Sequence, residues 1–156
     1  MSNEKFTLFW GGVFSNWHPC IFETDDMMFN CVEQYMMYHK AMLFDDQESA
    51  DKIMLSKSPR EQKALGRKVS NFDKDEWENV AWDIVHEGCR LKFQSDSYLL
   101  AQLLATEGTT LVEASPYDKI WGIGLDAKNP DAMIREKWQG TNWLGEILTD
   151  LREQYE

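Results

Sequence analysis

The sequence predicts a mostly helical α+β fold in a single domain over residues 1–156, with a small antiparallel sheet that we expect to line a cleft. Three observations predict this class. Several segments carry apolar residues at helical spacing behind recognisable caps, whereas only a few short runs have the content of strands. A chain of 156 residues that is 43% hydrophobic can fill one core. There are no internal repeats, linkers or low-complexity runs.

The first elements expected are strands. Residues 6–10 are apolar and aromatic and stop at a glycine pair, which predicts a strand. The runs 20–23 and 27–29 flank a Thr-Asp-Asp turn, which predicts a hairpin. This hairpin leads into a helix that we expect to begin at Asn30, because an Asn side chain can cap a first turn.

Further helices are predicted from cap signals. A second helix is expected over 46–56, and Ser58 followed by Pro59 and Glu61 predicts a short third helix that closes near Gly66. The remaining helices are expected behind Asp73 (74–93), Asp96 (to Gly108), Asn129 (to about Trp138) and Asn142 (to Arg152).

The period of the apolar residues changes after Thr109. Residues 110–114 and 120–124 have the pattern of two strands joined by the turn 115–119. Gly122 and Gly124 in the second run would let another group approach the backbone closely, as the wall of a pocket requires.

Composition excludes several classes of function. The net charge is −11, and no cluster of Lys and Arg is dense enough to follow a DNA or RNA backbone, although one or two cations could hold a single nucleotide or phosphate. The three cysteines show neither CxxC nor His spacing, so we expect free thiols in a reducing compartment and no metal site. The sequence lacks a signal peptide and a long apolar run, so we expect a cytoplasmic protein without membrane contact.

The candidate reactive groups lie on the helix expected after Asn30. Residues 33, 37, 40 and 44 share one face, so Glu33 and Lys40 point the same way about two turns apart, among Met and Phe side chains. Partly desolvated groups of this kind can have pKa values suited to acid, base or nucleophilic chemistry. The alternative is that Glu33 is the capping-box partner of Asn30 and that Lys40 extends over apolar surface to water.

Other candidates also have two interpretations. Asn16 and Trp17 stand on a loop, where they could sandwich a base and bind a sugar or could close a core edge. Arg67 could clamp a phosphate or only complement the end of a helix. Asp118 lies at a turn, for which an ordinary turn-forming role is the alternative.

A series of short motifs runs in one order along nearly the whole chain. They are Phe14-Ser15-Asn16-Trp17-His18-Pro19, Val32-Glu33-Gln34-Tyr35, Lys40-Ala41, Gly66-Arg67, Trp77, Trp82, Lys92-Phe93, Leu111-Val112-Glu113-Ala114-Ser115-Pro116-Tyr117-Asp118, Trp121-Gly122-Ile123-Gly124 and Gly140-Thr141-Asn142-Trp143-Leu144-Gly145. Together they resemble the signature of the NADAR superfamily, which includes N-glycosidases that act on early riboflavin-pathway intermediates.

This resemblance implies a hydrolase for the bond between a base or arylamine nitrogen and C1 of a phosphorylated ribose, with ribosylaminopyrimidine phosphates of the early riboflavin pathway as the expected substrates. Such a site needs a carboxylate near C1, a proton donor near the base and groups that hold the phosphate. The resemblance implies no cofactor, and no obligate protein partner is predicted. The implied catalytic residues are Glu33, Lys40 and Asp118, and the implied substrate-binding residues are Asn16, Trp17, Arg67, Trp121 and Gly122.

Three other functions stay open at this point. The enzyme could remove ADP-ribose from guanine, in which case its partner is a single modified nucleotide in DNA or RNA. A non-catalytic module could bind ADP-ribose or a related nucleotide, but such a module has little need for both Glu33 and Lys40. A structural interaction domain would use the Trp and Met residues as a partner surface and would show no stabilisation by small molecules.

Overall fold

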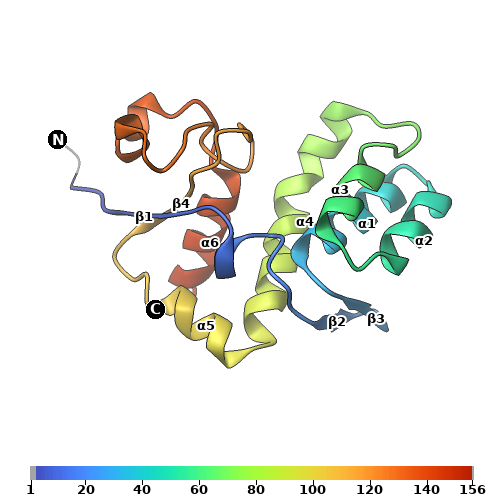
Figure 1. The fold of residues 1–156 in the computed structure, drawn as a ribbon. Coiled ribbons are helices and arrows are strands. Elements are labelled where there is room, and N and C mark those ends of the chain that lie inside the picture. Colours follow the sequence, from blue (N-terminus) through green and yellow to red (C-terminus); the bar gives the residue numbers. More distant parts are fainter. Residues whose placement is uncertain (1–2, 156) are drawn as a thin grey trace. The chain divides into compact units, whose positions relative to one another are not determined.

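The computed structural model describes residues 3–155, which form two compact units (Figure 1). The helical unit runs from Asn16 to Asp96. The terminal unit combines the residues up to Ser15 with those from Ser97 onward. The mostly helical α+β class predicted from the sequence is confirmed, whereas the assignment of the whole chain to one domain stays a prediction.

The helical unit begins with a hairpin and continues as helices. The turn of the hairpin has Asp25 and Asp26 at φ values of 53° and 63°, a conformation that Asp tolerates better than most residues. The pairing is antiparallel, as the predicted hairpin requires, and its register sets Phe22 opposite Phe29. The elements are β2 (Phe22–Thr24), β3 (Met27–Phe29), α1 (Val32–Leu43), α2 (Gln47–Leu55), α3 (Pro59–Gly66) and α4 (Lys74–Gln94).

Helix α1 is the core of this unit, because α2, α3 and α4 all pack against it (Figure 1). Every residue from 31 to 37 is buried. Two glycines allow the close packing: a Cβ added at Gly88 of α4 would lie 2.8 Å from the Tyr35 ring, and one added at Gly66 of α3 would overlap the Met37 sulfur. Any polar group on the first turns of α1 is therefore held away from bulk water.

The caps predicted at Ser58 for α3 and at Asp73 for α4 are confirmed, and Asp46 caps α2 in the same way. The side chains of Asp46, Ser58 and Asp73 each accept a hydrogen bond from the backbone N–H three residues later. The predicted cap at Asn30 is wrong, because Cys31 occupies the N-cap position of α1. The Asn30 side chain instead donates to the Ser56 carbonyl at 3.0 Å, which ties the start of α1 to the end of α2.

The terminal unit joins distant parts of the sequence. Strands β1 and β4 pair in parallel, with Phe6 opposite Thr110 and Phe9 opposite Glu113, and α6 packs on β4. The elements are β1 (Phe6–Phe9), the 3₁₀ turn η1 (Gly12–Phe14), α5 (Ser97–Leu104), β4 (Thr110–Glu113), the 3₁₀ turns η2 (Pro130–Met133) and η3 (Arg135–Lys137), and α6 (Trp143–Glu153).

The predicted strand at 120–124 is wrong, and β4 pairs with β1 instead. The Asp118 carboxylate accepts hydrogen bonds from the N–H groups of Ile120 and Trp121, which folds this segment into a turn. Gly124 has a φ of 71°, which also breaks an extended run. Ile123 still donates to the Glu113 carbonyl, so the segment is fastened beside β4 without forming a ladder.

Two helix predictions near the C-terminus need correction. The helix expected between Asn129 and Trp138 is two short 3₁₀ turns, because Ile134 between them is extended. Asn142 precedes α6 as predicted, but it is left-handed and makes no side-chain cap. Its amide instead accepts from the N–H of Glu113 and donates to the carbonyl of Leu111, which anchors α6 to β4.

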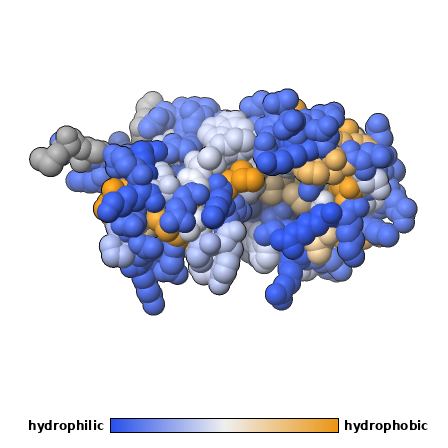
Figure 2. All heavy atoms as spheres, turned by 90° about the horizontal axis from the view of Figure 1, so that it is seen from above, coloured by the Kyte–Doolittle hydropathy of each residue, from blue (hydrophilic) through white to orange (hydrophobic). Residues whose placement is uncertain are grey.

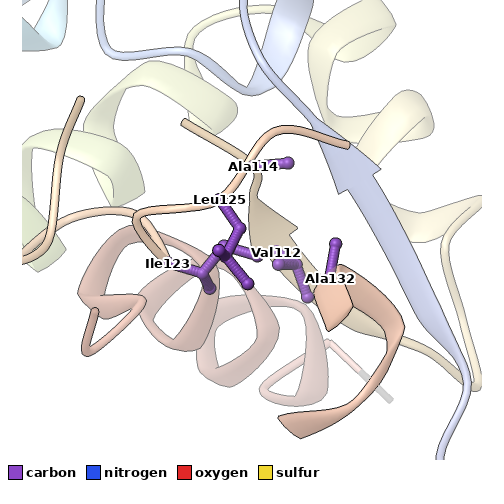
Figure 3. Packing of buried hydrophobic residues seen from close by; sticks show 5 residues of the cluster. All are labelled: Val112, Ala114, Ile123, Leu125 and Ala132. Atoms are coloured by element: carbon purple, nitrogen blue, oxygen red, sulfur yellow. The ribbon is translucent and has the colours of Figure 1, made fainter. Parts of the chain in front are cut away.

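A small cluster of buried apolar residues packs beside β4 in the terminal unit (Figure 3). Phe6, Leu8 and Trp138 pack against it from the side. The cluster draws on β4, the segment after it and η2, so the irregular region 120–132 is held by burial and not by a sheet. Its members are Val112, Ala114, Ile123, Leu125 and Ala132.

Hydrophilic side chains cover most of the face shown in Figure 2. Hydrophobic side chains appear there as small separate groups. Within residues 3–155, no helix combines the length and the apolar content that crossing a bilayer requires.

Candidate active site

The candidate site is built on one stripe of α1. The helix runs without interruption from Val32 to Leu43, so Glu33, Met37 and Lys40 lie on one face and Phe44 follows at the C-cap. Glu33 is only 5% exposed, and Met37 and Phe44 are buried as well. Lys40 is half-buried toward the C-terminal end of the stripe. The stripe thus carries a buried carboxylate and a partly desolvated amine.

The loop before α1 fixes Glu33 at two points. The indole Nε1 of Trp17 donates to Glu33 Oε1 at 2.8 Å, and the backbone carbonyl of Asn16 accepts from the Glu33 N–H at 3.0 Å. The Asn30 N–H is bound by Gln34 Oε1 at 2.8 Å, so Gln34 takes the place that a capping-box partner would occupy. The interpretation of Glu33 as the capping partner of Asn30 is therefore wrong, and its carboxylate faces Trp17.

Lys40 lies among aromatic rings. Its Nζ is 4.6 Å from the centre of the Phe72 ring and 6.0 Å from that of Trp77. Burial lowers the pKa of Lys40; the Glu33 carboxylate opposes this change, and the positive charge of Arg67 adds to it. The amine therefore gives up its proton more readily than an exposed lysine, and it feels both Glu33 and Arg67 electrostatically.

Arg67 follows the last residue of α3 and is exposed. Its backbone keeps helical dihedrals, with φ −71° and ψ −18°, and its N–H donates to the Lys63 carbonyl. A cation at this position complements the negative end of the α3 dipole, which is the second of the two interpretations given for Arg67. The positive charge of Arg67 also contributes to the lowered pKa of Lys40, so the two cations interact electrostatically.

Asn16, Trp17, Glu33, Lys40 and Arg67 thus belong to the helical unit, whereas Asp118, Trp121 and Gly122 belong to the terminal unit. Asp118 Oδ1 accepts from two backbone N–H groups, which gives this carboxylate the turn-forming role. Trp121 is half-buried and packs edge-on against Trp143, with ring centres 5.5 Å apart.

Gly122 is buried, and the atoms that lie closest to it belong to the backbone of the same unit. An added Cβ would lie 2.9 Å from the Glu113 carbonyl oxygen and 3.1 Å from that of Asp118. The sequence predicted a close neighbour at this glycine, and the neighbour observed is backbone of the same unit. The parts predicted for Asp118, Trp121 and Gly122 in catalysis and substrate binding stay predictions.

Sequence reasoning missed three residues around the stripe. Phe72 and Trp77 border Lys40, and Lys63 of α3 lies with its Nζ 6.0 Å from the centre of the Trp17 ring. Phe72 precedes the cap of α4 and Trp77 follows its first turn, so both fit a packing role by spacing alone. Only the fold of α3 and α4 against α1 reveals their proximity to the reactive groups.

A second buried cation lies deeper in the helical unit. Lys92 of α4 is 1% exposed, and burial lowers its pKa, while electrostatic interactions with the three cysteines act in the opposite direction. Burial raises the pKa of Cys20 to about 11 and those of Cys31 and Cys89 to about 12. All three thiols are free, and such values make them poor nucleophiles at neutral pH.

The arrangement around α1 has a definite chemical capacity. A carboxylate held by an indole N–H can stabilise positive charge or accept a proton from water. An amine with a lowered pKa can donate a proton or, when neutral, attack a carbon centre. The exposed ring of Trp17 can stack on a flat base, and the guanidinium of Arg67 can bind a phosphate.

Comparison with known proteins places this chain in a family. The NADAR domain model matches residues 8–156. An N-glycosidase of Acanthamoeba polyphaga mimivirus is 41% identical over 99% of this chain and 98% of its own length. N-glycosidase YbiA of Escherichia coli is 32% identical over 92% of this chain and 81% of its own length. A chloroplastic riboflavin biosynthesis protein of Zea mays is also 32% identical, over 92% of this chain but only 23% of that protein.

A solved structure agrees with the sequence comparison. The NMR structure of Escherichia coli YbiA superposes with a TM-score of 0.80 at 28% identity, covering 99% of this chain and 87% of that one. The family match thus extends over nearly every described element of both units, and the resemblance seen in the sequence motifs is confirmed. The chain belongs to the NADAR domain family.

Proposed function

We propose that this protein hydrolyses the N-glycosidic bond between a base or arylamine nitrogen and C1 of a phosphorylated ribose, with the ribosylaminopyrimidine phosphates of early riboflavin synthesis as its substrates. That the protein is a hydrolase of N-glycosyl compounds follows from its N-glycosidase relatives, which are 32–41% identical over most of the chain. The choice of substrate draws support from the relative named for riboflavin biosynthesis.

The observation that carries the proposal is the pairing of Glu33 with Lys40 on one stripe of α1. Cleavage of the C1–N bond develops positive charge on the sugar ring and negative charge on the departing nitrogen. A buried carboxylate beside C1 stabilises the first charge, and it can take a proton from the attacking water. Trp17 holds that carboxylate in place through a 2.8 Å hydrogen bond, so little reorganisation is needed.

Two roles for Lys40 fit this chemistry. As an ammonium, it donates its proton to the leaving nitrogen while water adds to C1, which yields the free base and ribose phosphate. As a neutral amine, it attacks C1, the nitrogen leaves with a proton, and the opened sugar is held as an imine that water hydrolyses. The lowered pKa of Lys40 favours the second role, because more of the amine is neutral at a given pH.

Trapping separates these roles. Borohydride added during turnover reduces an imine to a stable secondary amine, and peptide mass spectrometry would then find the sugar phosphate on Lys40. A trapped adduct at Lys40 supports the nucleophile, and turnover without any adduct assigns Lys40 to proton donation.

The experiment that tests the proposed substrate is a mass-spectrometric assay of the purified protein. The first substrate is a ribosylaminopyrimidine phosphate and the second is an oligonucleotide with ADP-ribosylated guanine, with Glu33→Gln as the blank. We expect free base and ribose phosphate from the first substrate. Cleavage of the second substrate alone would replace the proposed substrate with ADP-ribosylated nucleic acid. If neither is cleaved while ADP-ribose raises the melting temperature, the protein is a binding module and the proposal fails.

A further inference from the structure

We infer that Lys63, together with Arg67, forms the phosphate-binding subsite of this enzyme, and that Lys63 makes the site specific for a phosphorylated ribose. This inference rests on the proposed function and adds to it Lys63 as the residue that makes the site prefer a phosphorylated sugar. Two helices of the helical unit, α1 and α3, pack against each other and carry the residues concerned.

The cations of α3 follow the reactive stripe of α1. Lys63 and Arg67 are four residues apart on α3 and its C-cap, so they share one face of the helix. Lys63 lies over the ring of Trp17, whose indole holds Glu33. Arg67 is close enough to Lys40 to lower its pKa. Each end of the Glu33–Lys40 stripe thus has a cation of α3 beside it.

The segment around α3 is positively charged, although the whole chain is acidic. Residues 57–68 contain five cations, Lys57, Arg60, Lys63, Arg67 and Lys68, and one carboxylate, Glu61, so the segment carries +4 in a protein of net charge −11. A segment of this length is too short to follow a nucleic-acid backbone but suits one or two phosphate groups. Arg67, the member of this group that acts on Lys40, lies near the amine although its positive charge makes protonation of Lys40 less favourable, and a bound anion would offset that repulsion.

Lys63 differs from an ordinary surface lysine. It is half-buried, and its ammonium lies 6.0 Å from the centre of the Trp17 ring, a distance at which a cation is attracted to an aromatic face. A base stacked on the exposed part of Trp17 would place its ribose and phosphate near this ammonium. Lys63 would therefore read the phosphate while Trp17 reads the base, and Arg67 would supply a second, two-pronged contact.

The test measures binding of ribose 5-phosphate and of ribose by calorimetry, with wild type, Lys63→Met and Lys63→Arg. Met keeps the apolar stem over Trp17 and removes only the charge. We expect Lys63→Met to weaken ribose 5-phosphate binding by about tenfold and to leave ribose binding unchanged, since a charge-assisted contact to phosphate is lost. Lys63→Arg should retain most of the preference for the phosphorylated sugar. A thermal melt of each variant checks that it is folded.

The matched control is Lys52→Met, since Lys52 is an exposed lysine of α2 that pairs with Glu48 on the same helix. It should bind ribose 5-phosphate as wild type does. Equal binding by Lys63→Met and wild type, or an equal loss for ribose and ribose 5-phosphate, would overturn the inference. Failure of the proposed function is distinguishable, because a protein that cleaves neither nucleotide substrate can still show the phosphate preference and its loss in Lys63→Met.

Discussion

The hydrogen bond from Trp17 to Glu33 makes a quantitative prediction. The change is Trp17→Phe, which keeps an aromatic ring for stacking but removes the N–H that Glu33 Oε1 accepts at 2.8 Å. A hydrogen bond to a charged group contributes about 1.5–3 kcal/mol to stability. Trp17 is 40% exposed, so water can partly replace the lost donor, and we expect a cost at the lower end, about 1.5–2 kcal/mol.

The effect on catalysis follows from the same contact. If the indole holds the carboxylate in its reactive position, the loss appears in the transition state, and about 1.4 kcal/mol corresponds to a tenfold change in rate. We therefore expect kcat/KM of Trp17→Phe to fall by about 10- to 30-fold. The assays are steady-state hydrolysis and urea unfolding followed by circular dichroism, which does not depend on the removed indole.

Two controls isolate the hydrogen bond. Trp10→Phe makes the same change in ring size at a residue that is 56% exposed and packs on Tyr117 in the terminal unit, and it should cost little. In a protein that already carries Glu33→Gln, Trp17→Phe should lower the free energy of unfolding by about 1 kcal/mol less than it does in wild type. The reason is that an amide oxygen accepts a weaker hydrogen bond than a carboxylate. Equal costs on both backgrounds, or full activity of Trp17→Phe, would refute the reasoning.

Three further predictions concern packing and titration. Gly66→Ala, Gly88→Ala and Gly145→Ala should destabilise the protein to an extent that increases in that order, because the added Cβ meets the flexible Met37 side chain, the Tyr35 ring and the Leu111 backbone carbonyl respectively. Urea midpoints check this, and Gly88→Ala in the interior of α4 regains about 1 kcal/mol of helix propensity. Arg67→Gln removes a like charge, so the pKa of Lys40 should rise toward its ordinary 10.5, and an NMR titration of Lys40 should move to higher pH; a shift to lower pH would contradict the placement of Arg67. Backbone and side-chain donors from Ser70 and Ser49 hold the pKa of Asp46 at about 2 against an ordinary 3.8, so its contribution is present above pH 3.8 and is lost as the pH falls toward 2. Asp46→Asn keeps a capping side chain and should flatten the acid dependence of stability in that window, whereas an unchanged acid limb would show that Asp46 does not titrate this way.

Local signals in the sequence were sufficient for most helices. Asp46, Ser58 and Asp73 are followed by apolar residues at helical spacing, and each caps the helix expected. These signals involve neighbours within one turn, so no tertiary information is required. The same holds for the hairpin, whose turn chemistry lies in Asp25 and Asp26.

The errors arose where distant contacts decide the structure. Strand β4 pairs with β1, about a hundred residues earlier in the chain, and no local pattern distinguishes this partner from the run at 120–124. Asn30 has the chemistry of a cap, but hydrogen bonds to Gln34 and Ser56 direct it elsewhere. The side chain of Asn142 likewise hydrogen-bonds to β4, so it does not cap the N-terminus of α6.

The candidate site was predictable only in part. The spacing of Glu33 and Lys40 on one helix face needs only the helical period, and motif resemblance drew attention to it. Lys63, Phe72 and Trp77 come from other segments, and their approach to Trp17 and Lys40 depends on how α3 and α4 pack around α1. Their residue types and spacing are those of ordinary core and surface positions.

The most direct test of the central claim is a single-turnover measurement on the ribosylaminopyrimidine phosphate with wild type, Glu33→Gln and Lys40→Met. Glu33→Asp would be measured beside them as the conservative variant, and unfolding in urea would check the fold of each. The account predicts that Glu33→Gln and Lys40→Met each slow C1–N cleavage by about a hundredfold or more, as the loss of a catalytic acid, base or nucleophile does. Cleavage within a few fold of wild type by either folded variant would contradict the assignment of the reaction to the stripe of α1.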